Sequence, residues 1–263
     1  ACLPKEDYPI IETDNSGIEI ILNSKIFFKL IDKTKFAISN EETRYFLNGL
    51  YFNITNESNK NIVTLVGTDG HRLAKFSHEI SEQIEQVSGV IIPKKTIYEL
   101  SKLLSEINND VKISVSSNKI VFIIGNIIFI SKLIDGSFPD YKRVIPNDNI
   151  NILKIKRDKL LSAVDRVSTI ANEKSPVIKF KLLQNVLNLN TINNESSTAS
   201  EDLKINYEGD EIEIGFNSKY IMDIVNNLDD EEISIKLKDS TSPVIAQENS
   251  NSDLVYVLMP MRV

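Results

Sequence analysis

Residues Val90 to Lys95 read Val-Ile-Ile-Pro-Lys-Lys, and residues Ile214 to Lys219 read Ile-Gly-Phe-Asn-Ser-Lys. The first stretch leads into one predicted helix, and it occupies the place that the second stretch, at the start of another predicted helix, holds later in the chain. Pro93 favours such a start because proline suits the first helical turn. The stretches agree in pattern more than in identity, and the elements around them follow the same order of helix, strands, helix and strands. We therefore interpret the chain as two copies of one α+β unit.

Helical periodicity and capping residues predict two helices in each unit. Asn23 and Ser24 resemble an N-cap, and the apolar residues after them recur at helical spacing. The predicted helices cover residues 23–39, 93–104, 157–171 and 215–228.

Short hairpin signals separate runs of strand-forming residues. Gly125-Asn126 and Gln184-Asn185 are examples, because glycine and asparagine tolerate a positive φ. Strands separated by such turns pair in antiparallel fashion, so the fold class is α+β with two tandem two-helix, antiparallel-sheet units. The edge strands of such units need a partner, and joining units edge to edge into a closed ring is one way to supply it. The predicted strands cover residues 45–55, 61–67, 71–77, 111–116, 119–124, 127–133, 177–183, 186–192, 232–238, 242–247 and 254–259.

The domain limits follow from this repeat. Residues 1–17 have no periodic pattern and are predicted to be a connector. Residues 18–146 form the first predicted domain and residues 147–263 the second, with the division near residues 146–151.

Composition narrows the class of protein. The chain has 263 residues, one cysteine, two histidines and a formal net charge of −7. Apolar runs are far shorter than the ~20 residues that span a bilayer, and the start of the sequence has no signal-peptide pattern, so we expect a cytoplasmic protein. So few thiols and imidazoles predict no metal site, and we expect no cofactor. The net charge disfavours wrapping DNA by bulk attraction, unless the positive residues are gathered on one face.

Positive charge is concentrated on predicted helices. Residues 23–39 contain four lysines and one aspartate, and residues 156–174 contain five basic and three acidic residues. The simple interpretation is a solvated helix face. The alternative is a mildly positive helical lining that contacts phosphates without reading bases, which suits a protein that slides on DNA.

Thr68-Asp69-Gly70-His71-Arg72-Leu73 is the densest cluster of functional residue types. A hydrolase using Asp69 and His71 is one interpretation, although adjacency in sequence rarely gives catalytic geometry. The alternative is an Asp-Gly turn between two strands.

The last residues, Val255-Tyr256-Val257-Leu258-Met259-Pro260-Met261-Arg262-Val263, place two methionines around a proline after a strand. Such a pair is commonly core filler. However, Pro260 cannot continue a central strand, and exposed methionines adapt to several partners.

Together with Phe138-Pro139-Asp140-Tyr141-Lys142-Arg143-Val144 and Arg44-Tyr45-Phe46-Leu47-Asn48-Gly49, these two segments resemble the bacterial DNA polymerase III beta subunit, or beta sliding clamp. The resemblance covers essentially the whole chain and corresponds to the second and third domains of that family. The first domain of the family has no counterpart, and residues 1–17 resemble only the connector that follows it.

The resemblance implies a non-catalytic processivity subunit of a DNA polymerase that encircles duplex DNA, without sequence preference, as a head-to-tail homodimeric ring. It also implies a cleft that docks short linear peptides of polymerase subunits, the clamp loader and repair proteins. A chain without the family's first domain is expected not to close that ring. A protein-interaction scaffold unrelated to replication remains an alternative, because it would also bind peptides.

The family's functional residues map onto this sequence. Apolar members of the cleft would bury leucine and phenylalanine anchors, while Arg72, Arg143 and Asn217 would orient the polar end of the peptide. Ser175, Thr241 and Pro243 differ from the family pattern, which leaves the peptide preference open at the edges of the cleft. The expected peptide-binding residues are Leu47, Thr68, Gly70, His71, Arg72, Leu73, Pro139, Arg143, Val144, Asn217, Tyr220, Val257, Leu258, Met259, Pro260, Met261 and Arg262. The expected DNA-facing residues are Lys25, Lys29, Lys33, Tyr45, Phe46, Lys94, Lys95 and Arg157.

Overall fold

The computed structural model describes residues 2, 4, 17–57, 59–80, 87–172, 176–192 and 197–262. The first unit contains β1 (Ile18–Asn23), α1 (Ser24–Asp32), β2 (Gly49–Glu57), β3 (Lys60–Thr68), β4 (Arg72–Ile80), β5 (Val87–Pro93), α2 (Lys94–Ser105), β6 (Asp110–Val115), β7 (Lys119–Ile124) and β8 (Ile127–Lys132). The second contains β9 (Asn151–Lys156), α3 (Arg157–Ser168), β10 (Val177–Leu183), β11 (Val186–Ile192), β12 (Thr198–Lys204), β13 (Ile212–Asn217), α4 (Ser218–Asn226), β14 (Glu232–Leu237), β15 (Val244–Glu248) and β16 (Leu254–Leu258).

The two units repeat the same order of elements, which confirms the predicted α+β fold class. The strands form antiparallel sheets of orders β1-β6-β7-β8, β12-β11-β10-β13 and β5-β2-β3-β4-β16-β15-β14-β9. The strand β1 pairs with β6 as β9 pairs with β14, and β2 pairs with β5 as β10 pairs with β13. The pairing pattern is therefore duplicated as well as the element order.

The helices α1, α2 and α3 begin within one residue of the predicted start, whereas α4 begins at Ser218 rather than at residue 215, because residues 215–217 belong to β13. The side chains of Asn23 and Asn217 each accept a hydrogen bond from the backbone N–H two residues later, at 3.0 Å, and so cap α1 and α4. The predicted end of the first helix at residue 39 is wrong. The hydroxyl of Thr34 donates to the carbonyl of Leu30 at 2.7 Å, and a short 3₁₀ helix follows at Lys35–Ala37.

Two further expectations need correction. The strand expected from residue 45 begins at Gly49, because residues Glu42–Leu47 form a 3₁₀ helix. The strands β1, β5, β9, β12 and β13 lie outside the predicted ranges. Each of β1, β5, β9 and β13 runs directly into a helix. The residues that mark the start of the helix therefore lie at the end of the strand and make its alternating pattern hard to recognise.

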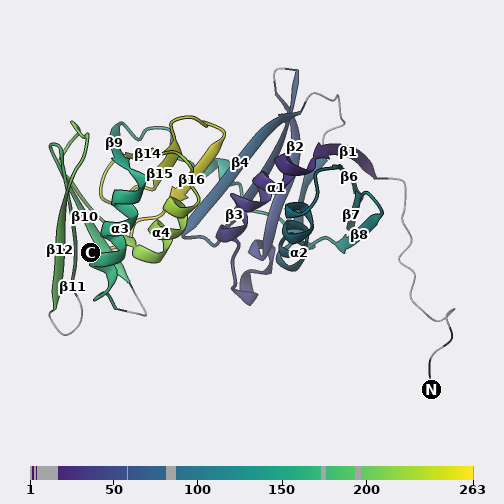
Figure 1. Ribbon diagram of the computed structural model, residues 1–263, viewed down its shortest axis with the longest axis horizontal. Coiled ribbons are helices and arrows are strands. Elements are labelled where there is room, and N and C mark those ends of the chain that lie inside the picture. The colour runs from purple at the N-terminus through teal and green to yellow at the C-terminus, as the bar shows by residue number, and fades with distance from the viewer. Residues whose placement is uncertain are drawn as a thin grey trace.

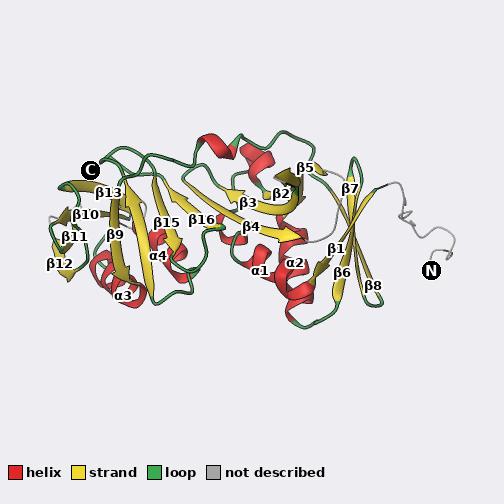
Figure 2. Cartoon of the chain, turned by 90° about the horizontal axis from the view of Figure 1, so that it is seen from above, coloured by secondary structure: helices red, strands yellow, loops and turns green. Residues whose placement is uncertain are grey.

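A single antiparallel pairing joins the two units into one eight-stranded sheet. The strand β4 pairs with β16 in a register that places Leu73 opposite Val257 and Ala74 opposite Tyr256. Figure 1 shows these two strands side by side between the units, and Figure 2 shows α1 to α4 on the same side of the long sheet. The edge strands that the sequence left unpartnered thus meet at this joint.

Strand alternation at the joint sends side chains to two different clusters. Ala74, Leu254, Tyr256 and Leu258 join the main core, which also contains the buried faces of the helices. On the opposite face, Leu73, Val255 and Val257 belong to a smaller cluster with Val66, Tyr141 and Ile245. The joint therefore has one face in the core and one face toward the outside of the sheet.

Polar contacts beneath the joint tie the units together. The buried hydroxyl of Tyr256 lies 3.0 Å from the carbonyl oxygen of Lys33 and 3.1 Å from that of Asn227. The ammonium of Lys33 donates to the carbonyl of Asn227 at 2.8 Å and to Asp229 at 2.5 Å. Lys33 is only 7% exposed, so the expectation that it faces DNA is wrong. Its charge is used inside the contact between the units.

None of the helices in the described residues is long and apolar enough to cross a membrane.

The hydroxyl of Tyr256 provides a test of the joint. We expect Tyr256→Phe to lower the free energy of unfolding by about 1–2 kcal/mol, because the buried carbonyl of Lys33 and the part-buried carbonyl of Asn227 lose the one hydroxyl donor that they share, while the packing of the ring is kept. Urea unfolding measures the change. Tyr45→Phe is the matched control, since the ring of Tyr45 is 54% exposed, and its stability should be unchanged. Equal stability of both variants would contradict the role assigned to this hydroxyl.

Candidate functional site

An apolar cavity of about 350 Å³ lies on the outer face of the joint. Leu73 and Val257, which are paired across β4 and β16, contribute to its lining, and Met259 follows directly from β16. The backbone N–H of Met259 donates to the carbonyl of His71 at 2.9 Å, so the end of the chain is held against the β3–β4 turn. The full lining is Arg44, Phe46, Leu47, Thr68, Gly70, Arg72, Leu73, Pro139, Tyr141, Val144, Val257 and Met259. We call this cavity the joint pocket.

The turn at residues 68–71 forms one wall of the joint pocket. The carboxylate of Asp69 accepts hydrogen bonds from the backbone N–H groups of His71 at 2.9 Å and Arg72 at 3.0 Å. Gly70 has a φ of 88°, a backbone conformation that favours glycine. Asp69 thus shapes a turn. It bonds to the backbone of His71 rather than to its imidazole, and this geometry gives no support to the hydrolase alternative.

Arg72 connects the turn to both units. Its guanidinium donates to Asp69 at 3.1 Å, to the carbonyl of Phe36 at 2.9 Å and to Asp223 of α4. The same group lies 4.5 Å from the ring centroid of Tyr220 and 5.2 Å from that of Phe36. The side chain is 10% exposed. With all three guanidinium nitrogens already donating, Arg72 holds the pocket wall in place.

Nine of the expected peptide-binding residues meet in the joint pocket. They are Leu47, Thr68, Gly70, Arg72, Leu73, Pro139, Val144, Val257 and Met259. His71 and Tyr220 line an adjacent depression of about 380 Å³ with Asp69 and Arg72, and their rings stack with centroids 6.2 Å apart.

The other expected residues lie outside the joint pocket. Leu258 is wrong as a lining residue, because alternation along β16 turns it into the main core, where it is 2% exposed. Asn217 uses its side-chain oxygen to cap α4, and Arg143 is exposed and pairs with Asp140 at 2.9 Å. A separate cavity of about 550 Å³ is lined by Glu213, Ser240, Thr241, Pro260, Met261 and Arg262.

Thr241 lies beside Pro260, Met261 and Arg262 in that separate cavity. Pro243 lies just before β15, and its carbonyl accepts from Asn149 at 3.0 Å. Ser175 lies outside the described residues.

Arg44 and Tyr141 also line the joint pocket, although the sequence did not predict them there, and Phe46 was expected to face DNA. Phe46 lines the joint pocket instead, because the 3₁₀ helix turns it toward the outer face of the sheet. Tyr141 is buried with its ring tilted against that of Tyr51, and burial raises the pKa of its hydroxyl. Both Phe46 and Tyr141 belong to the motifs that carried the family resemblance, and these motifs could have identified them as lining residues.

The other basic residues expected to face DNA differ in exposure and in how far their charges are already paired within the protein. Lys25, Lys29 and Lys95 are exposed on α1 and α2. Lys94 donates to Asn40 and lies over the ring of Tyr98. The guanidinium of Arg157 donates to the carbonyl of Leu228 at 2.9 Å and pairs with Asp158, so part of its charge is used within the second unit. Among the described residues, groups of three or more His, Cys, Asp or Glu placed to hold a metal are absent.

Known proteins share this architecture. Residues 21–140 match the family model for the central domain of the DNA polymerase III beta subunit, and residues 142–262 match that for its C-terminal domain. The "Beta sliding clamp" of Caulobacter vibrioides (strain NA1000 / CB15N) is 40% identical over 261 residues, which are 99% of this chain and 70% of that protein. The "Beta sliding clamp" of Escherichia coli (strain K12) is 36% identical over 261 residues, which are 99% of this chain and 70% of that protein.

A solved structure agrees with the fold as well. The crystal structure of a DnaN sliding clamp (DNA polymerase III subunit beta) from Bartonella birtlesii bound to griselimycin aligns with a TM-score of 0.94 at 44% identity. The alignment covers 100% of this chain and 70% of that one.

Replacing Arg72 tests its structural role. We expect Arg72→Lys to lower the free energy of unfolding by about 1–3 kcal/mol, because one ammonium cannot serve two carboxylates and a carbonyl while stacking on two rings. Chemical unfolding measures the loss. Arg143→Lys is the matched control, because Arg143 is 87% exposed, and it should show no measurable change. If the two substitutions had equal effects, Arg72 would not be the link between the units.

Proposed function

Since this chain belongs to the bacterial DNA polymerase III beta subunit family, the beta sliding clamps, we propose that it holds partner proteins on duplex DNA and catalyses no reaction itself. The observation that supports this most directly is the joint pocket. It is an apolar cavity open to solvent at the contact between the two units, next to a turn whose carboxylate is occupied by backbone hydrogen bonds. Such a site suits docking rather than chemistry.

The partners that fit the joint pocket are short linear peptides with apolar anchors. Leu73 and Val257 supply a buried apolar base, while Val144 and Met259 remain 39% and 36% exposed at the rim. A leucine or phenylalanine anchor would bury these rim side chains and displace water. We propose polymerase subunits, the clamp loader and repair proteins as the sources of such peptides, and the cytoplasm as the place where they meet.

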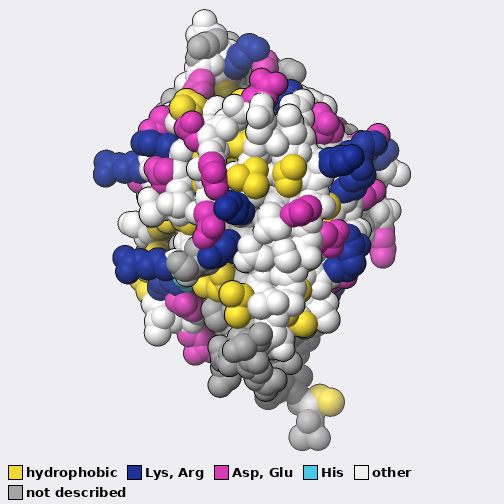
Figure 3. Space-filling view, turned by 90° about the vertical axis from the view of Figure 1, so that its left-hand side faces the viewer, with side chains coloured by type: hydrophobic (Ala, Val, Ile, Leu, Met, Phe, Trp, Pro, Cys, Tyr) yellow, Lys and Arg dark blue, Asp and Glu magenta, His cyan; other side chains and the backbone are white. Residues whose placement is uncertain are grey.

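The free edges of the two units suggest how a ring forms. In the duplicated pattern β4 corresponds to β12, and β8 corresponds to β16. The joint pairs β4 with β16. The free edge strand β12 is therefore equivalent to β4, and the free edge strand β8 is equivalent to β16. Ile128 on β8 is 59% exposed, and Ile192 on β11, beside β12, is 69% exposed. Figure 3 shows the β12 end, where apolar side chains lie among charges of both signs.

We propose that similar joints at β8 and β12 complete a head-to-tail ring with two protomers. The chain spans 70% of the length of the relative from Caulobacter vibrioides. We also propose residues 18–146 and 147–263 as the domain limits. The two family matches support a division in this region, because one ends at residue 140 and the other begins at residue 142.

The helix side of the sheet is the proposed DNA-facing side. It carries α1 to α4 from both units, with the exposed lysines 25, 29 and 95 on α1 and α2. A few such lysines in a chain of net charge −7 give weak, sequence-independent phosphate contacts. Weak contacts suit a ring because topology, rather than affinity, keeps it on DNA.

Peptide binding is measured by fluorescence polarisation with a labelled Gln-x-x-Leu-Phe type peptide. We expect saturable binding and a loss of about 1–3 kcal/mol in Met259→Ala, as for a buried anchor contact. Ile150→Ala is the control, because Ile150 is 77% exposed and does not line the joint pocket, and it should bind like the original chain. Binding that is absent below millimolar peptide would refute the docking function.

DNA binding is tested through its salt dependence. We expect a variant with Lys25, Lys29 and Lys95 changed to Gln to reduce the slope of log K against log salt concentration by up to about 0.9 per lysine removed. The control replaces Lys60, Lys112 and Lys132, which lie on strands, with Gln at the same total charge. Equal slopes for the two triple variants would contradict a DNA-facing helix side.

A further inference from the structure

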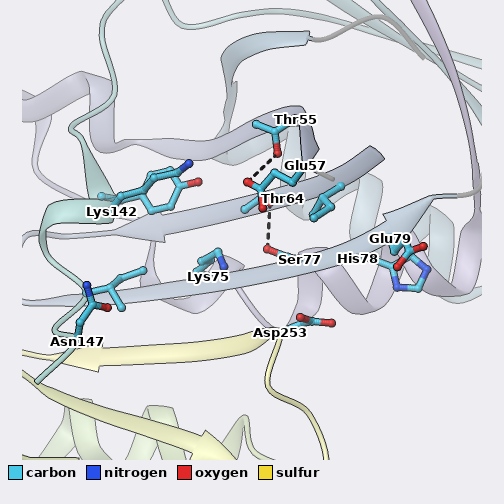
Figure 4. Close-up of a pocket in the computed structure, with 13 residues that line it drawn as sticks. Thr55, Glu57, Thr64, Lys75, Ser77, His78, Glu79, Lys142, Asn147 and Asp253 are labelled. Carbon is cyan, nitrogen blue, oxygen red and sulfur yellow. Dashed lines mark hydrogen bonds between the residues drawn. The ribbon is translucent and has the colours of Figure 1, made fainter. Parts of the chain in front are cut away.

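A second cavity, of about 440 Å³, lies on the same outer face of the sheet as the joint pocket. Figure 4 shows its side chains, which are mostly polar. The hydroxyls of Thr64 on β3 and Ser77 on β4 lie 3.0 Å apart on its base, at a directly paired position. The lining is Thr55, Glu57, Ile62, Thr64, Lys75, Ser77, His78, Glu79, Tyr141, Lys142, Ile145, Asn147 and Asp253. We call this cavity the polar groove.

The polar groove continues the joint pocket along the same strands. On β4, residues 73, 75, 77 and 79 share one face, so Leu73 of the joint pocket is followed by Lys75, Ser77 and Glu79 of the groove. On β3, Thr68 and Thr64 are related in the same way. Lys75 lies two residues, about 7 Å, beyond Leu73, and Ser77 lies four residues, about 13 Å, beyond it. An extended peptide covers these distances with about two and about four residues of its own.

The wall between the two cavities belongs to both. Tyr141 lines each of them, Val144 lines the joint pocket, and Lys142 and Ile145 line the groove. Lys142 and Val144 are both exposed on this wall. A peptide that leaves the joint pocket along the strands therefore meets Lys142 before it enters the groove.

Two lysines in the groove lack a close counter-charge. Within the described residues, neither Lys75 nor Lys142 has a carboxylate within ion-pair distance, whereas Glu79 pairs with Lys60 at 2.7 Å. Burial lowers the pKa of Lys75, the more distant Asp253 and Glu57 oppose that shift, and the positive charge of Lys142 adds to it. An anion placed between the two ammonium groups would relieve their repulsion.

The charges are arranged so that the end nearest the joint pocket is positive. In Figure 4, Lys75, Lys142 and Asn147 lie toward one end, and His78, Glu79 and Asp253 lie toward the other. A chain arriving from the joint pocket reaches the positive end first. This order favours an acidic side chain at that position over a basic one.

We propose that the polar groove is an extension of the peptide-docking site and that its lysines bind an acidic side chain of the partner, about two to four residues from the apolar anchors. This rests on the proposed peptide docking at the joint pocket. The groove would thereby select among partners that share the same anchors, because a basic residue at that position meets two unpaired ammonium groups.

The test uses three labelled peptides with one Gln-x-x-Leu-Phe core. Each carries an extension of four residues, in which Gly-Ser is followed by two Glu, two Ser or two Lys. Each peptide is made in two versions, one with the extension before the core and one with the extension after it. For one of the two directions we expect the Glu peptide to bind about three- to tenfold tighter than the Ser peptide at low salt. The advantage should shrink as salt rises, because part of the contact is exposed.

Variants of the chain locate the source of this advantage. Lys75→Gln and Lys142→Gln should each remove most of it and leave the affinity for the Ser peptide unchanged. Lys142→Glu should instead favour the Lys peptide. Lys132→Gln, an exposed lysine on β8, is the matched control and should keep the full advantage. Lys142 is exposed, so its variants are informative even if Lys75→Gln destabilises the chain.

The outcomes separate this proposal from the docking function itself. If the Glu and Ser peptides bind equally in both directions, or if the advantage survives in Lys142→Gln, the groove is not an extension of the site. The joint pocket would still be supported by the binding of the Ser peptide. If the Ser peptide also fails to bind, the docking function fails and the extension fails with it.

Discussion

The pairing of β4 with β16 is the interaction on which the rest of the structure depends. It turns the end strands of two units into one continuous sheet, and so it satisfies backbone groups that each unit alone would leave open. The hydroxyl of Tyr256, the ammonium of Lys33 and the guanidinium of Arg72 add contacts between the same units. These donor groups are largely buried, so each needs a hydrogen-bond acceptor from the other unit, which only the joint brings within reach.

The joint also explains why a binding site exists at this place. Strand alternation sends one set of side chains into a core shared with the helices and the next set outward, where Leu73 and Val257 form an apolar base. Residues 44–47, the turn at 68–71, residues 139–145 and the chain end then form walls around it. The pocket is built from segments of both units, and its shape depends on their relative placement.

Charge is divided between the two sides of the sheet. The helix side carries exposed lysines suited to weak phosphate contacts, whereas the outer side carries apolar and mixed-charge cavities suited to peptides. A sliding clamp needs both weak, sequence-independent contacts with DNA and selective binding of partner proteins. In the proposed function, placing them on opposite faces of one sheet would keep the partner's peptide away from the DNA.

The sequence by itself determined the local structure and the family. Asparagine caps, hairpin dipeptides and helical periodicity depend on neighbours within a few residues, and they located the helix starts and most of the strands. The short motifs that resemble the family also named most of the residues of the joint pocket. The tertiary structure alone decided that Lys33 is buried, that Leu258 faces the core, that Phe46 lines the pocket and that Arg72 is a link between units. These outcomes depend on strand register and on contacts as distant as the 223 residues between Lys33 and Tyr256, which no local pattern encodes.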